Sequence, residues 1–219
     1  MPLYYEKDFG RNSQLCIWKI TESLEELLEI YEAKNDIFVG EIKTQKRKLE
    51  YVAVRILLKK MVKNNELFVE LIKDEFGKPH LKDTARHISI SHTGQFIAVF
   101  LHDAYVVGVD LEMILPRIKK LSSRFLSKAE MKWMKKKNNR EQLYIIWGAK
   151  ECAYKIYSKG GIDFKEMLEV REFDYAKEGA TFVTLKKSKI SCEYPVFWEN
   201  LGKLMLVYGI ANQVSISQN

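Results

Sequence analysis

The sequence is poor in the residues that hold small extracellular scaffolds together. Only three of its 219 residues are cysteines, Cys16, Cys152 and Cys192, and no two of them form a Cys-x-x-Cys pair. An odd number of widely spaced thiols indicates neither a disulfide framework nor a structural zinc site. We predict that all three are small buried or half-buried apolar side chains. The four histidines also lack the spacing of a zinc-ligand set.

Long apolar runs are absent as well. No uncharged apolar stretch approaches the ~18 residues that a membrane-spanning helix needs. The first eight residues lack the basic-then-apolar order of a secretory signal, so we expect a cytoplasmic protein. With 47% hydrophobic and 30% charged residues, the composition is that of an ordinary globular chain. Its length allows one large domain or two of about 110 residues.

Positive charge is in excess. The chain has 36 Lys and Arg residues against 29 Asp and Glu residues, a net charge of +7, which favours an acidic partner without identifying it. Nucleic acid, an acidic protein and a polyphosphate cofactor all qualify. The densest basic stretch runs from Lys132 to Arg140, and a solvated helix end explains that stretch equally well.

Hydrophobic periodicity and turn residues predict an α+β fold made of two similar halves, residues 1–103 and 104–219. We expect a duplicated, pseudo-twofold unit, in which each half is a small antiparallel sheet packed with a long helix. The active site is expected in the cleft between the halves. Helices are predicted at 23–33 and 43–62 and from Ser127 and Asn138 or Asn139 onward, and strands at 14–20, 67–73, 87–91, 95–102, 105–112, 181–185, 189–198 and 203–211.

Two acidic residues occupy one face of the strand predicted at 105–112. Because side chains alternate along a strand, Asp110 and Glu112 point the same way from Cα atoms ~6.6 Å apart. Gly108 lies on the same face and leaves room for a close approach. Two such carboxylates can share a divalent cation. The alternative is a half-exposed strand with its polar face in water.

A third carboxylate lies on the last predicted helix. Glu151 is one turn before Lys155 and one turn after Trp147. A simple i,i+4 ion pair explains Glu151 and Lys155, but helical phase places both off the apolar stripe, so they face water or a ligand. A hard cation beside an ammonium group suits a phosphate substrate.

A weaker signal precedes the glycine turn at Thr93 and Gly94. Ser91 and His92 enter this turn, and a hydroxyl, an imidazole and backbone donors together can bind a phosphate. A histidine at a strand end is more often a local hydrogen-bonding group. Glu130 has a local explanation too, because it stands three residues after Ser127 in a capping box.

Taken in order, five segments resemble the motifs of the 4'-phosphopantetheinyl transferases of the larger, surfactin-synthetase type. Their order, their intervals and the chain length match the family, whose long members are internal duplications. Thr93 replaces the serine that usually follows the histidine, which keeps the hydroxyl. The segments are Phe76-Gly77-Lys78-Pro79, Ile90-Ser91-His92-Thr93-Gly94, Gly108-Val109-Asp110-Leu111-Glu112, Phe125-Leu126-Ser127-Lys128-Ala129-Glu130, and Trp147-Gly148-Ala149-Lys150-Glu151 through Lys155.

The resemblance implies transfer of the phosphopantetheine arm from coenzyme A to a serine of an acyl or peptidyl carrier protein, with release of adenosine 3',5'-bisphosphate. It implies a Mg²⁺ ion, or Mn²⁺ in its place, held by Asp110, Glu112 and Glu151. Catalytic roles fall on Glu151, Lys155, Glu130 and His92, with Glu151 or Glu130 as the base for the serine. Contacts with coenzyme A fall on Lys78, Pro79, Ser91, His92 and Lys155, and Arg47 or Lys46 holds the 3'-phosphate.

The same resemblance assigns the coenzyme pocket to the N-terminal half and the metal and catalytic residues to the C-terminal half. An acidic carrier protein as partner would explain the positive net charge of the chain. Lys132–Lys137 form a candidate docking patch for that carrier. Because a duplicated chain completes its own cleft, we expect a monomer. Two alternatives stay open: a basic nucleic-acid-binding module, which leaves the three acids unexplained, and another metal-dependent phosphotransferase or nuclease.

Overall fold

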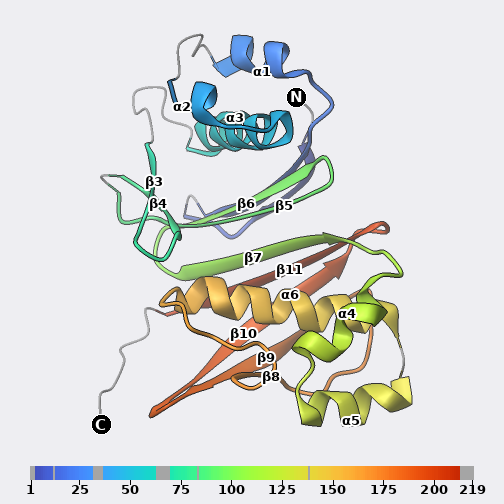
Figure 1. Ribbon diagram of the computed structural model, residues 1–219. Coiled ribbons are helices and arrows are strands. Elements are labelled where there is room, and N and C mark those ends of the chain that lie inside the picture. The colour runs from blue at the N-terminus through green and yellow to red at the C-terminus, as the bar shows by residue number, and fades with distance from the viewer. Residues whose placement is uncertain are drawn as a thin grey trace.

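The computed structural model describes residues 3–11, 13–31, 37–62, 70–82, 84–137 and 139–212. Two antiparallel sheets lie side by side, and helices cover the outer face of each (Figure 1). The predicted α+β class is therefore confirmed. Within the described ranges, the structure contains no helix with both the length and the apolar character of a membrane span.

The first sheet has the strand order β1-β2-β6-β5. Helix α3 packs on its outer face, and α1 packs on α3. The short hairpin of β3 and β4 precedes β5. These elements are β1 (Leu3–Asp8), β2 (Gln14–Lys19), α1 (Leu24–Tyr31), α2 (Ile37–Glu41), α3 (Gln45–Met61), β3 (Leu71–Lys73), β4 (Pro79–Leu81), β5 (His87–Thr93) and β6 (Phe96–His102).

Helix α3 forms where its sequence predicts it. The hydroxyl of Thr44 accepts a hydrogen bond from the backbone N–H of Arg47, which caps the first turn. Apolar residues three and four positions apart, including Val52, Ile56 and Leu57, are buried against the sheet. The lysines and arginines of the helix are thereby kept off this buried face.

The second sheet has the strand order β7-β11-β10-β9-β8, and α6 packs across it. The side chain of Asn139 caps the start of α6, and Ser158 ends the helix in the left-handed conformation with a φ of 51°. The elements of this half are β7 (Val106–Met113), α4 (Ile118–Phe125), α5 (Lys128–Lys137), α6 (Arg140–Tyr157), β8 (Leu168–Val170), β9 (Glu178–Lys187), β10 (Ile190–Asn200) and β11 (Leu204–Ala211).

The two sheets share an apolar core. Val107, Val109 and Leu111 of β7 pack against Leu15 and Phe100 of the first sheet. Because side chains alternate along a strand, the intervening residues of β7 face α6 instead. The strand that carries the predicted acidic pair is thus in the middle of the molecule, with one sheet on one side and a helix on the other.

Most of the predicted elements are present, with ends that differ by a few residues. The helix α4 was not predicted: Pro116 precedes it, and no side chain caps its first turn, so its start has no sequence signal. The predicted strand at 67–73 is observed only as Leu71–Lys73, and residues 67–69 lie outside the described ranges. The duplication and the boundary after residue 103 stay predictions.

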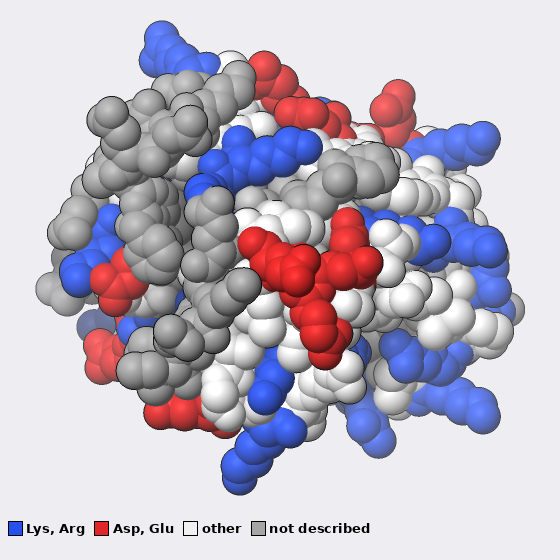
Figure 2. Space-filling model, turned by 90° about the horizontal axis from the view of Figure 1, so that it is seen from above, with Lys and Arg blue, Asp and Glu red and all other residues white. Residues whose placement is uncertain are grey.

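Charge is mixed on the face that α1 covers. Seen from above, acidic side chains gather near its middle, and basic side chains stand around its edge (Figure 2). Helix α1 carries the exposed residues Glu25, Glu26 and Glu29, whereas α3 carries six lysines and arginines. The described part of this face is therefore not a continuous basic surface, despite the net charge of +7.

Candidate active site

Asp110 and Glu112 project from β7 toward α6, on the face that also carries Gly108. The helix passes so close that a Cβ atom at Gly108 would lie 2.5 Å from a carbonyl oxygen of α6. A Cβ atom at Gly148 of the helix would lie 2.6 Å from Cγ2 of Val207 on β11 and at van der Waals distance, 3.5 Å, from Oδ2 of Asp110. Only glycine permits the close approaches to α6 and to Val207 at these two positions, and across the packed strand and helix the charges of Asp110 and Glu112 act on Glu151 of α6.

The three acids influence one another. Burial, followed by the negative charge of Asp110, raises the pKa of Glu151 to about 7. The same two causes, in the same order, raise the pKa of Glu112. Lys155 opposes the shift of Glu151, and Arg117 and Lys155 oppose the shift of Glu112. Negative charge in this cluster therefore exceeds the positive charge available to balance it.

Lys155 connects α6 to β7. Its Nζ donates hydrogen bonds to the carbonyl oxygen of Val109 at 2.6 Å and to Oδ1 of Asp110 at 3.2 Å. Burial lowers the pKa of Lys155, but the attraction of Asp110 and Glu151 outweighs it, and the net result is a raised pKa. The ammonium group is therefore held in its charged form beside Asp110.

The acids fit a hard divalent cation by their chemistry. Asp110, Glu112 and Glu151 offer only carboxylate oxygens, which Mg²⁺ prefers, and the negative charge of Asp110 helps to raise the pKa values of Glu112 and Glu151. Among the described residues, however, no three Asp, Glu, His or Cys side chains are near enough to one another to form a ready metal cluster. In the free chain, the Lys155 ammonium supplies the positive charge next to Asp110.

Ser91 and His92 lie on opposite faces of β5. Ser91 is 7% exposed, and its hydroxyl donates to Oδ1 of Asp110 at 3.2 Å. His92 is exposed on the α3 side, with Nδ1 3.5 Å from Oε1 of Glu50. The same Glu50 oxygen lies 3.7 Å from Nζ of Lys46. The two residues predicted to contact phosphates therefore have different neighbours: Ser91 contacts Asp110, whereas His92 lies near Glu50.

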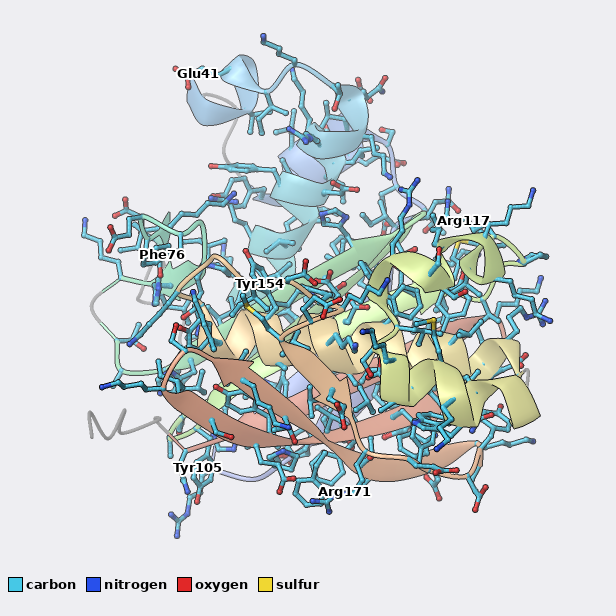
Figure 3. The ribbon with its side chains drawn as sticks, turned by 60° about the horizontal axis from the view of Figure 1, so that its bottom comes forward. Glu41, Phe76, Tyr105, Arg117, Tyr154 and Arg171 are labelled. Carbon is cyan, nitrogen blue, oxygen red and sulfur yellow. The ribbon has the colours of Figure 1, made fainter. Side chains whose placement is uncertain are left out.

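Two cavities flank the acids. A cavity of about 240 Å³ next to β4, called here the β4 cavity, is lined by the predicted residues Lys78, Pro79 and Lys155, together with Phe76 and Tyr154. Burial lowers the pKa of Lys78. Phe76 and Tyr154 lie on the same side of the molecule, near the end of α6 (Figure 3). The β4 cavity therefore joins the hairpin of the first half to the helix of the second.

The second cavity, about 310 Å³, lies between α4 and α6 and is called here the α4 cavity. Figure 3 shows Arg117 at the start of α4, on the opposite side of the picture from Phe76. Glu112 opens into this cavity, and Arg117 and Arg124 add positive charge to an otherwise apolar lining that includes Leu121 and Trp147. The two arginines and the cavity were missed in the sequence because α4 itself was not predicted.

Glu130 lies apart from the three acids in a saturated buried network. Its side chain and that of Lys150 are both 0% exposed, and Oε2 of Glu130 is 2.7 Å from Nζ of Lys150. Glu130 also accepts hydrogen bonds from the backbone N–H groups of Ser127 and Val170. Lys150 donates further to the carbonyl oxygens of Phe125 and Phe164. This arrangement favours a structural role for Glu130 over its predicted role as a base.

The two basic residues considered for the 3'-phosphate are exposed at the start of α3. Lys46 pairs loosely with Glu50, and the Arg47 side chain is exposed. Neither lines the two cavities described above. Glu50 is the single acid of α3, and no sequence pattern connected it with His92, because the two residues lie on different elements.

Comparison with known proteins bears on this geometry. Residues 106–201 match the family model of the 4'-phosphopantetheinyl transferase superfamily. The chain is 29% identical to 4'-phosphopantetheinyl transferase Sfp of Bacillus subtilis over 113 residues, 50% of each chain. It is 30% identical to 4'-phosphopantetheinyl transferase AcpT of Salmonella typhi over 132 residues, 58% of this chain and 66% of AcpT.

The matches thus span between half and two thirds of the length of these curated relatives. The match to the family model begins at the first residue of β7 and includes α4, α5 and α6. It therefore contains Asp110, Glu112, Glu151 and Lys155. Residues 106–201 are therefore similar to the 4'-phosphopantetheinyl transferase superfamily, in agreement with the resemblance of the sequence motifs.

Proposed function

We propose that this chain transfers the 4'-phosphopantetheine arm from coenzyme A to a serine of an acyl or peptidyl carrier protein. The observation that carries the proposal is the cluster of Asp110, Glu112, Glu151 and Lys155, which reaches a cavity on either side. A reaction between a pyrophosphate and a protein hydroxyl needs a charged centre that adjoins two binding sites. The names of the relatives support the same activity.

In this proposal the β4 cavity receives coenzyme A. Lys78 and Lys155 line that cavity and provide positive charge for its phosphates, and Pro79 contributes an apolar wall. His92, together with Arg47 or Lys46, binds the remaining phosphate groups on the α3 side. The N-terminal half thereby contributes most of the coenzyme contacts, and the C-terminal half contributes the acids.

The proposed reaction breaks one phosphoanhydride bond. The serine oxygen attacks the phosphorus atom that bears the pantetheine arm, the bond from that phosphorus to the bridging oxygen breaks, and adenosine 3',5'-bisphosphate leaves. Glu151 is the proposed base that accepts the serine proton, because it is the acid of α6 that lies in the electrostatic field of Asp110 and Lys155. Lys155, held protonated by Asp110, stabilises the leaving phosphate.

Asp110, Glu112 and Glu151 are the residues that would hold Mg²⁺, with Mn²⁺ as an alternative. The ion would supply a Lewis acid that neutralises charge on the pyrophosphate. Their oxygen-only donor set and the raised pKa values of Glu112 and Glu151 support this assignment.

The carrier protein is proposed to dock over α4 and the α4 cavity. Residues 113–129 contain five lysines and arginines and no acidic residue. Arg117, Lys120, Arg124 and Lys128 are exposed there, with the exposed Leu121 among them. This surface is next to Glu112, so an acidic carrier bound to it would place its serine near the acids. Of the predicted patch Lys132–Lys137, the side chains of Lys135–Lys137 lie outside the described residues.

We also propose that the enzyme is a cytoplasmic monomer whose halves divide after residue 103. The mixed charge in Figure 2 gives no support to the alternative of a nucleic-acid-binding module on that face. Another metal-dependent phosphotransferase would use the same acids, so only the identity of the product separates it from the proposed enzyme.

Mass spectrometry of a carrier protein tests the proposal directly. Incubation of the chain with coenzyme A, Mg²⁺ and an apo carrier should add about 340 Da to the carrier, the mass of the transferred arm. The variant Asp110→Asn, at the same concentration, should leave the carrier unmodified. A carrier that gains no mass at several pH values and with several carrier classes would refute the assigned activity.

A further inference from the structure

A row of three hydroxyl groups joins the two sheets. On β5, Ser89, Ser91 and Thr93 stand at alternate positions, and each hydroxyl accepts a hydrogen bond from a backbone N–H of β7. The donor–acceptor distances are 3.0 Å from Val109, 3.1 Å from Leu111 and 3.4 Å from Met113. The spacing of two residues on both strands makes this a regular seam between them.

The seam forms where two sheet edges meet. In the strand orders of the described residues, β5 ends the first sheet and β7 ends the second, and they are not paired by backbone hydrogen bonds. Every second N–H of β7 points away from β11 toward β5. Unpaired buried N–H groups are costly, and the hydroxyls of β5 satisfy three of them in place of a neighbouring strand.

Two of the three hydroxyls also contact the acids. Ser91 Oγ is 3.2 Å from Oδ1 of Asp110, and Thr93 Oγ1 is 3.5 Å from Oε2 of Glu112. A hydroxyl that accepts from an amide still has its own proton to donate. In Ser91 and Thr93 that proton points to a carboxylate oxygen, whereas the Ser89 hydroxyl has no such contact among the described residues.

We propose that Ser91 and Thr93 are positioning residues that orient Asp110 and Glu112 for the divalent cation. The inference rests on the proposed function only where it names the cation. Ser91 is suited to this role because its hydroxyl and the Lys155 ammonium approach the same Oδ1 atom, each at 3.2 Å. Together they leave Oδ2 of Asp110 as the oxygen available to an ion.

The seam contains its own control. Ser89→Ala, Ser91→Ala and Thr93→Val each remove one hydroxyl and one hydrogen bond to β7, but only the last two remove a contact with an acid. We therefore expect all three variants to lower the thermal unfolding temperature to a similar extent. Only Ser91→Ala and Thr93→Val should weaken the binding of Mn²⁺, by roughly tenfold, as the loss of a group that orients a metal ligand does.

The binding of Mn²⁺ is measured on the purified chain by titration calorimetry or electron paramagnetic resonance, with and without coenzyme A. Thr93→Ser keeps the hydroxyl and should retain the wild-type affinity for Mn²⁺. Equal Mn²⁺ affinity in Ser89→Ala, Ser91→Ala and Thr93→Val would overturn the proposal. So would a Ser91→Ala variant with a raised KM for coenzyme A and an unchanged Mn²⁺ affinity, because that pattern identifies Ser91 as a phosphate contact.

These readouts separate the inference from the proposed function. If the wild-type chain binds Mn²⁺ and the variants differ as expected, the positioning role stands even where the carrier assay shows no transfer of the arm. If the carrier assay succeeds and the variants bind Mn²⁺ equally well, the proposed function stands and the positioning role fails.

Discussion

Helix α6 carries one buried and one half-buried lysine, five residues apart, whose surroundings are opposite in kind. Lys150 is 0% exposed and donates to three acceptors at 2.7–2.8 Å, one of them the single carboxylate of Glu130. The side chain of Lys155 is 24% exposed, and its ammonium group pairs with Asp110 and interacts electrostatically with Glu112 and Glu151. One site is balanced and closed, and the other has excess negative charge and adjoins two cavities.

The contrast separates charges that stabilise the fold from charges that bind a ligand. The Glu130–Lys150 pair has every hydrogen bond it needs, so no ligand can improve it. The cluster around Lys155 is short of positive charge, so it gains free energy when a cation arrives. Stability and binding are therefore assigned to neighbouring turns of the same helix, and variants at the two sites should behave in opposite ways.

The largest effect is expected for Glu151→Gln. Replacing the acid by its neutral isostere removes the proposed base, and the rate of arm transfer should fall by about 10²–10⁴-fold. The unfolding temperature should not fall, because the substitution removes one of three mutually repelling charges. Initial rates of carrier modification and thermal melts measure the two quantities. A variant that melts well below the wild type would contradict the division between the two sites.

The opposite pattern is expected for Lys150→Met. It leaves the buried Glu130 without its cation, and breaking a buried pair in this way costs about 3–5 kcal/mol. Urea titration measures the free energy of unfolding. The double variant Lys150→Met/Glu130→Leu removes both charges and should recover most of the loss. If the single variant is as stable as the wild type, the pair is not the stabilising element that its geometry indicates.

The pH dependence of stability should also distinguish the sites. The pKa of Glu151 is raised to about 7 in the folded chain, from an ordinary value of about 4.3. Between these values the folded state binds more protons than the unfolded state, so Glu151 makes stability fall as the pH rises. Compared with Glu151→Gln in the presence of a chelator, the wild type should lose at most about 4 kcal/mol over that range.

Saturating Mg²⁺ should cancel that difference, because the ion stabilises the charged carboxylate. This prediction is tested by measuring the unfolding free energies of the wild type and Glu151→Gln at pH 5 and pH 7.5, with and without Mg²⁺. Parallel pH curves in the chelator would show that burial and the charge of Asp110 do not raise the pKa of Glu151 in the folded chain.

Sequence reasoning succeeded where the property is local. The alternation along β7 placed Asp110 and Glu112 on one face with Gly108, and the structure has all three toward α6. The capping box at Ser127 is also present, with reciprocal hydrogen bonds between Ser127 and Glu130. Such patterns depend on neighbours within one strand or one turn, which the sequence displays directly.

Contacts between different helices and strands could not be predicted from the sequence. Periodicity fixes the face on which Ser91 lies but not that β7, with Asp110, lies opposite that face. The capping box likewise explained Glu130 and concealed its pairing with Lys150, which is 20 residues away. Both contacts depend on how the two sheets and α6 are arranged in space, and the sequence of a single segment does not determine that arrangement.

The smallest expected effect concerns Glu50, an acid that belongs to neither pattern. Its Oε1 is buried and has no hydrogen-bond partner among the described residues, and it lies 3.5 Å from His92 and 3.7 Å from Lys46. If these two bases bind phosphates, Glu50 competes with the ligand for them. Glu50→Gln should then lower the KM for coenzyme A by about two- to fivefold, the size of a partly exposed ion pair.

The control Glu29→Gln removes one negative charge from the exposed face of α1 and should leave that KM unchanged. Coenzyme A without its 3'-phosphate tells which group benefits: if Lys46 holds the 3'-phosphate, Glu50→Gln should gain little with the truncated substrate. An increase in KM for coenzyme A would reverse the interpretation, because Glu50 would then orient His92 and Lys46 instead of competing for them. Either sign places the acid of α3 within the electrostatics of the coenzyme site, and an unchanged KM removes it.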